Sequence, residues 1–158
     1  MYKLTFLLLI LLILGTYSYD ASAQSSNSSN EITNTPMKSF VAIFEIPATD
    51  LDRAVTFYQE LLNIDIERME FPGMAMGLFP YADQLVTGVI MQGEGYKPSA
   101  DGITIYFHAG DNLQPVLDQV ESNGGKILVP KTSHADESGF FALILDSEGN
   151  KIGLHSLN

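Results

Sequence analysis

The chain has 158 residues, no cysteine and a formal net charge of −11 at pH 7. The length fits a single domain, and the lack of cysteine excludes disulfides, thiol catalysis and thiolate metal sites. The acidic balance argues against nucleic acid and anionic membranes, which need clustered Lys or Arg, and favours a small or cationic partner.

The first residues have the pattern of a secretory signal peptide. Lys3 precedes an apolar run over residues 4–14, and Ala21-Ser22-Ala23 then supplies the small side chains of a cleavage site. The run is shorter than the ~20 residues of a membrane-spanning helix. We therefore expect residues 1–23 to be removed, and the mature chain to be exported to the periplasm or the medium without a membrane anchor.

The next segment, residues 24–36, is rich in Ser, Asn and Thr. Such a composition cannot offset the entropy cost of ordering the chain. We expect a flexible linker here, followed by a folded domain over residues 37–158.

This domain opens with a strand that leads into a helix. Residues 40–46 are strand formers interrupted by one charge, Glu45, and residues 51–62 place apolar side chains at helical spacing. Pro47 is expected to end the strand because it has no N–H for the ladder, and Asp50 to cap the helix.

The order of strand, helix and three strands then occurs twice. A Gly-rich connector over residues 93–102 separates the two copies, Pro130 is expected to close a strand of the second, and Gly124-Gly125 to end its helix. The expected strands cover residues 40–46, 64–71, 74–79 and 85–92, and then 103–109, 126–129, 140–145 and 151–156.

The pattern predicts an α+β fold of two βαβββ repeats, at about residues 38–92 and 102–157. Each helix covers one face of its sheet. The other faces enclose a groove for a small molecule if the two sheets curl toward each other or toward a second chain, so a homodimer is one of the two arrangements expected.

Three motifs extend over nearly the whole domain. They are the strand-to-helix run at 46–62, Asn-Gly-Gly-Lys-Ile at 123–127 and Leu-Asp-Ser-Glu-Gly-Asn-Lys-Ile-Gly-Leu-His at 145–155. In this combination the chain resembles the vicinal-oxygen-chelate superfamily of glyoxalase I, extradiol dioxygenases, and fosfomycin- and bleomycin-resistance proteins. The resemblance implies a glyoxalase-like fold, with lyase or dioxygenase chemistry around a divalent metal in its active members.

The resemblance also places His, Glu or Gln ligands at four strand positions, which fall by approximate alignment on Ile43, Met91, Thr104 and Gly153. None of these is a usual ligand, so a divalent metal would need a shifted site. Glu45 and His155 each lie two residues from one of the four positions, on the same strand face and roughly 7 Å along the strand.

Glu45 and His155 allow three interpretations. They bind a metal, with or without His108, at a shifted site of a lyase or dioxygenase, or they form an acid-base pair in a metal-free pocket. In the third, which we take as the main prediction, the groove binds a cationic or hydroxylated small molecule, with lyase activity left open. A non-catalytic interaction module, with its groove filled by its own side chains, is a further alternative.

Further candidates for ligand binding surround this pair. Tyr106 and His108 share a strand face with Thr104, and Tyr96 lies on the connector, which can act as a lid or merely join the repeats. A single His such as His155 is also commonly solvated, and His134 lies in a loop where exposure is expected. The methionines suit an adaptable apolar pocket as well as ordinary core filling; they are Met69, Met74, Met76 and Met91.

Overall fold

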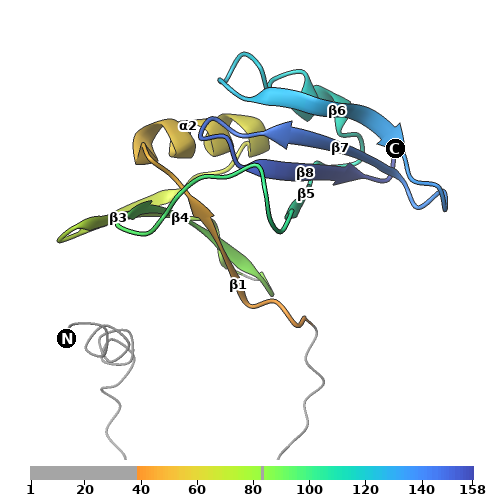
Figure 1. Cartoon of the computed structure of the whole chain (residues 1–158). Coiled ribbons are helices and arrows are strands. Elements are labelled where there is room, and N and C mark those ends of the chain that lie inside the picture. Colours follow the sequence, from red (N-terminus) through yellow and green to blue (C-terminus); the bar gives the residue numbers. More distant parts are fainter. Residues whose placement is uncertain (1–38, 83) are drawn as a thin grey trace, which may run out of the picture. The chain divides into compact units, whose positions relative to one another are not determined.

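A computed structural model describes residues 39–82 and 84–158 of the chain (Figure 1). The predicted signal peptide and linker lie outside the described residues. Within the described part, no helix has the length and apolar character needed to cross a membrane.

The first repeat forms a four-stranded sheet with one helix. Its elements are β1 (Ile43–Pro47), α2 (Leu51–Leu62), β2 (Glu67–Phe71), β3 (Met74–Leu78) and β4 (Thr87–Gly93). The strand order is β1-β4-β3-β2, and β1 runs parallel to β4 while the other pairs are antiparallel.

The second repeat builds the same arrangement. Its elements are β5 (Tyr106–His108), α3 (Gln114–Leu117), β6 (Lys126–Ser133), β7 (Phe140–Leu145) and β8 (Lys151–Ser156). The strand order β5-β8-β7-β6, with β5 parallel to β8, matches that of the first sheet. The predicted α+β fold of two βαβββ repeats is confirmed.

Helix α2 begins and ends where its local signals indicate. The Asp50 side chain accepts a hydrogen bond from Arg53 N at 3.0 Å, and Asn63 ends the helix in the left-handed conformation, with φ of 52°. The buried stripe of the helix consists of Leu51, Ala54, Val55, Phe57, Tyr58 and Leu61. Burial of this stripe, rather than helix propensity alone, stabilises the element.

The second helix is much shorter than predicted. The turn segment after Leu117 contains Ser122 and Asn123, whose side chains both donate to the carbonyl of Gln119. Such bonds offer the backbone an alternative to the helical pattern. The rest of the helix that was predicted to run up to Gly124-Gly125 is therefore replaced by turns, although Val120 in this segment is fully buried.

Pro130 does not end its strand, contrary to the prediction. β6 continues to Ser133, and its register against β7 shifts between Ile127 and Val129 and again between Val129 and Thr132. Because β6 is an edge strand and Pro130 lies at an irregularity, no ladder bond requires its missing N–H. Strand β5 is also shorter than the predicted 103–109, and Ile103 is 90% exposed.

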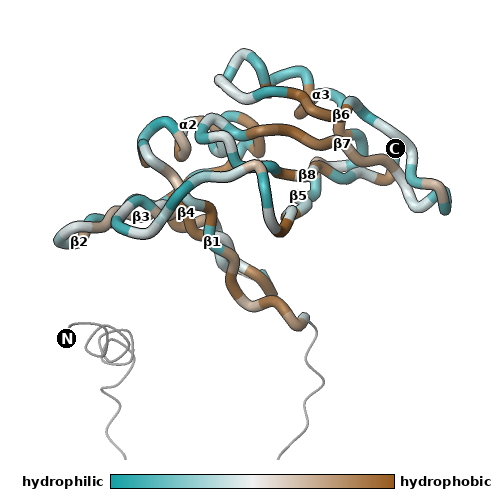
Figure 2. Tube along the Cα trace, viewed as in Figure 1, coloured by the Kyte–Doolittle hydropathy of each residue, from teal (hydrophilic) through white to brown (hydrophobic). Residues whose placement is uncertain are grey.

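One hydrophobic core joins the two repeats. The rings of Phe44 on β1 and Phe107 on β5 lie 5.6 Å apart, and Tyr58 on α2 lies 5.8 Å from Phe107. Figure 2 shows the hydrophobic stretches along β1, β4 and β7. The opposite faces of both sheets point away from this core.

A polar contact also ties the repeats together. Glu148, in the turn between β7 and β8, accepts hydrogen bonds from the backbone N–H of Thr49 at 2.8 Å and of Asp50 at 3.1 Å, just before α2. Its carboxylate also pairs with Arg53 at 2.7 Å. The Asp-x-x-Gly-Asn motif therefore binds the strand-to-helix corner of the first repeat.

Candidate functional site

Glu45 lies on β1, on the face of the first sheet that points away from the core. It is exposed, and the Tyr96 hydroxyl donates a hydrogen bond to its Oε2 atom at 3.2 Å. Burial, together with the Glu45 charge and this hydrogen bond, raises the pKa of the Tyr96 phenol. The structure therefore brings together two predicted site residues, Glu45 and the connector residue Tyr96.

His155 lies in a group of histidines on the second sheet. It is directly opposite His108 in the β5–β8 register, with 6.1 Å between the ring centroids. The ring of His134 lies 5.5 Å from His155 and 4.9 Å from Phe141. His155 thus has both other histidines of the chain as neighbours.

His134 was expected to be an exposed loop residue, but it is half-buried in this group. The loop folds back so that His134 N donates to the Gly139 carbonyl at 2.9 Å. This return depends on β6 running past Pro130. Phe141 on β7 is directly opposite His155, so the His134 ring beside Phe141 also lies beside His155. Strand alternation alone does not indicate that a loop residue packs on this face.

The structure does not join Glu45 to His155. No hydrogen bond or ion pair links them in the described residues; Glu45 binds Tyr96, whereas His155 lies with the other histidines. Glu45 instead lines a cavity of about 190 Å³ at the junction of the repeats, together with Lys97 and Lys151. The open faces therefore carry two separate polar groups.

The four positions at which the resemblance implies metal ligands do not fit a divalent ion. Ile43 and Gly153 have no donor side chain, and Met91 and Thr104 supply a thioether and a hydroxyl. The bare Cα of Gly153 is covered by the Tyr106 ring, so a larger side chain there would overlap that ring. Across residues 39–82 and 84–158, no three His, Cys, Asp or Glu side chains are grouped to hold a metal.

An open cleft of about 630 Å³ lies between the start of β1 and β5. Three of the predicted ligand-binding residues line it, namely Thr104, Tyr106 and His108. Apolar side chains, including Phe44 and Leu85, form much of the rest. Tyr106 is 47% exposed, so its phenol ring is available to a molecule in the cleft.

The composition of this cleft resembles that of small-molecule sites, which have apolar and aromatic walls with a few placed polar groups. The imidazole of His108 can donate and accept hydrogen bonds, and the hydroxyl groups of Thr104 and Tyr106 can do the same. The cleft can therefore bind a flat or apolar molecule that carries polar substituents.

Comparison with known proteins identifies a family and relatives that are similar to this chain. The model of the Glyoxalase/Bleomycin resistance protein/Dioxygenase superfamily matches residues 40–154. A glyoxylase-like domain-containing protein of Didymella fabae is 31% identical over 115 aligned residues, and the match covers 67% of this chain and 84% of that protein.

Solved structures show the same fold at lower identity. TnmS3, an antibiotic binding protein from Streptomyces sp. CB03234, superposes with a TM-score of 0.58 at 20% identity, over 75% of this chain and 95% of that one. Glyoxalase I from Zea mays has a TM-score of 0.56 at 18% identity, over 73% of this chain. The chain spans less than half the length of that enzyme, 45%.

Proposed function

This chain belongs to the glyoxalase/bleomycin resistance protein/dioxygenase superfamily, and we propose that it binds a small organic molecule in the cleft between β1 and β5. The observation that carries the proposal is the meeting of Tyr106, His108 and Thr104 with apolar side chains in a volume of about 630 Å³. Typical ligand pockets measure ~300–1,000 Å³.

The charge of the chain indicates the kind of ligand. A net charge of −11 raises the local concentration of cations and repels anions. The Tyr106 ring offers a π-face to an aromatic or cationic group, and His108 and Thr104 offer hydrogen bonds to its substituents. We therefore propose an aromatic, uncharged or cationic ligand with hydroxyl or amine groups. The antibiotic binding of TnmS3, a protein of the same fold, is in keeping with such a ligand.

A thermal-shift screen tests this proposal directly. Matched sets of cationic, neutral and anionic aromatic compounds are compared, and a ligand at a hundred times its dissociation constant stabilises the chain by about 2.7 kcal/mol. Cationic and neutral compounds should raise the melting temperature. The shift should be lost in Tyr106→Ala and His108→Ala.

The matched controls are Tyr81→Ala and His134→Ala. Tyr81 lines a different cleft of about 570 Å³ beside β2, and His134 does not line the cleft of Tyr106. Loss of the shift in Tyr81→Ala alone would place the ligand in that other cleft. A screen in which only anionic compounds bind would overturn the proposed ligand class.

The catalytic alternative has less support. A metal-dependent lyase or dioxygenase lacks suitable residues at the four positions described above, and no hydrogen bond or ion pair within the described residues links Glu45 to His155. A metal-free lyase would have to move its proton through His108, the imidazole that lines the cleft. If the chain converts a ligand of the cleft to a product, and His108→Ala abolishes this conversion, the proposed function would be catalysis and not binding alone.

Export is the second part of the proposal. It rests on the signal-peptide pattern of residues 1–23, which lie outside the described residues. The intact mass of the mature chain tests it, since cleavage after Ala23 leaves Gln24 as the first residue. A mass that includes residues 1–23 in the exported fraction would contradict cleavage at this site.

A further inference from the structure

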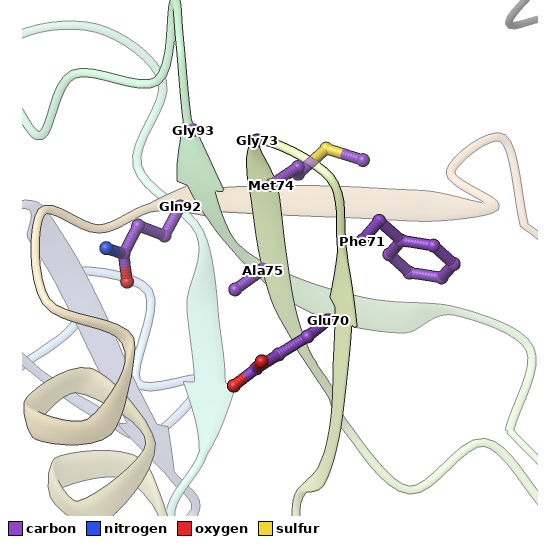
Figure 3. A pocket seen from close by; sticks show the side chains of 7 residues that line it. All are labelled: Glu70, Phe71, Gly73, Met74, Ala75, Gln92 and Gly93. Atoms are coloured by element: carbon purple, nitrogen blue, oxygen red, sulfur yellow. The ribbon is translucent and has the colours of Figure 1, made fainter.

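The methionines of the described part all lie on one face of the first sheet. Met69 on β2 is directly opposite Met76 on β3, and Met76 is directly opposite Met91 on β4. Met74, two residues before Met76, points to the same face. Figure 3 shows Met74 and Phe71 extending to one side of the strands and Ala75 and Gln92 to the other.

Three of these methionines form a row across neighbouring strands, which we call the methionine row: Met69, Met76 and Met91. Adjacent strands are roughly 4.8 Å apart, so directly opposite side chains are nearest neighbours on the sheet. Met69 and Met76 are half-buried, and Met91 is 5% exposed. A small ion can therefore reach the row, and its inner end is shielded from water.

We propose that the methionine row binds a soft monovalent metal ion, Cu(I) or its analogue Ag(I). Thioether sulfur is a soft ligand that favours Cu(I) over Mg²⁺, Ca²⁺ and Mn²⁺. The methionine side chain is unbranched with three rotatable bonds, so sulfurs from neighbouring strands can turn toward one ion.

One carboxylate on this face favours a cation. Glu67 lies two residues from Met69 on β2 and so shares its face, and its side chain is exposed. The carboxylate raises the local concentration of cations, while the soft ion itself prefers sulfur to carboxylate oxygen.

Branched apolar side chains also lie on this face of the sheet. Val89 and Leu78 on the same face are the branched side chains that fill such surfaces, yet the three directly opposite positions all carry sulfur. The row also differs from the four positions implied by the family resemblance. It shares only Met91 with them, and its other members come from β2 and β3.

The test uses the full-length chain with methionine labelled by ¹³C at the methyl group. Anaerobic titration with Cu(I) against a chromophoric Cu(I) chelator measures affinity and stoichiometry, and Ag(I) serves for NMR in air. We expect one ion per chain, with shifts of the methyl resonances of Met69, Met76 and Met91. The resonance of Met74 should move least.

Leucine variants give matched comparisons because Met→Leu conserves volume and apolar character. Met69→Leu, Met76→Leu and Met91→Leu should each weaken binding by roughly tenfold or more, which equals about 1.4 kcal/mol. Met74→Leu, on the same face but outside the row, should change the affinity by less than about twofold.

Three outcomes would overturn the proposal. The chain fails to retain Cu(I) against the chelator, Met74→Leu weakens binding as much as the row variants do, or a variant lacking His108 and His155 loses the ion while the row variants keep it. The result is independent of the proposed small-molecule function, because Tyr106→Ala and His108→Ala affect the cleft at β5 and leave the methionine row intact.

Discussion

The hydroxyl of Tyr58 on α2 donates a hydrogen bond of 2.7 Å to Oδ2 of Asp146, in the turn between β7 and β8. The two residues belong to different repeats, and both are buried, with 0% and 3% of their surface exposed. Asp146 also accepts bonds from the backbone N–H groups of Glu148 and Asn150. Burial, followed by the charge of Asp146, raises the pKa of Tyr58 well above its ordinary value.

Removing this hydroxyl should destabilise the chain without changing its fold. Tyr58→Phe leaves one lone pair of a buried carboxylate without its donor, and such losses cost about 1–3 kcal/mol. We expect the midpoint of urea unfolding to fall with the slope unchanged. The control is Tyr81→Phe, since Tyr81 is 61% exposed, and equal losses in both variants would contradict the buried link.

Glu148 should make stability depend on pH. Burial of its side chain opposes ionisation, but hydrogen bonds from Arg53, from Thr49 and from the backbone of Asp50 outweigh burial and lower the pKa of Glu148 below 4.5. The folded chain therefore holds the carboxylate ionised more strongly than the unfolded chain does. This contribution is fully present above that ordinary value and is lost as the pH falls through the folded-state pKa.

Glu148→Gln should accordingly destabilise the chain most at neutral pH. The difference in free energy of unfolding from the unmodified chain should shrink as the pH is lowered below 4.5, and urea unfolding across this range measures it. Glu60→Gln, at an exposed position of α2, is the control. A difference between Glu148→Gln and the unmodified chain that grows toward acid pH would contradict the lowered pKa of Glu148.

Gly125 is required for close packing between the repeats. A Cβ atom at this position would lie 2.7 Å from the carbonyl oxygen of Leu145 and 2.8 Å from the ring of Phe57 on α2. The carbonyl belongs to the backbone and cannot move away cheaply. Gly125→Ala should therefore cost about 1–3 kcal/mol, the range for overpacked cores.

Thermal or urea unfolding of Gly125→Ala measures this cost. Ser122→Ala is the control at an exposed position of the same turn segment, and it removes only a hydroxyl bonded to the carbonyl of Gln119. A Gly125→Ala chain as stable as the Ser122→Ala chain would contradict the tight approach.

The sequence predicted those parts of the fold whose signals are local. Asp50 and Asn63 determine the ends of α2 by hydrogen bonds within one turn. The turn over residues 146–150 determines where β7 ends and β8 begins. The short α3 and the continuation of β6 past Pro130 depend on competing side-chain bonds and on an edge position. Neither is visible in apolar periodicity.

The candidate site was predicted only in part, for a geometric reason. Alternation along a strand places Glu45 and His155 on the open faces, but it gives no distance between strands of different sheets. Tyr106 and His108 both line the cleft. They lie on one strand, where the alternation of side chains is enough to predict that they share a face. The binding of a small molecule, export and a homodimer stay predictions.

The contact between Gly153 and Tyr106 gives the last prediction. The two residues are directly opposite in the β5–β8 register, and the Tyr106 ring lies over the bare Cα of Gly153. A Cβ at Gly153 would overlap this ring, so Gly153→Ala must push the ring away from β8. Because the ring is 47% exposed it can move, and we expect a loss of about 1–2 kcal/mol, in the lower part of the range for overpacking.

A double-mutant cycle isolates this contact. In the Tyr106→Ala background the ring is gone, so Gly153→Ala should cost much less than it does in the unmodified chain, and the two changes should be non-additive by about 0.5–3 kcal/mol. Urea unfolding of the four chains measures the coupling. Additive losses of stability would show that the ring does not contact Gly153. The steric argument against a metal ligand at position 153 would then be wrong as well.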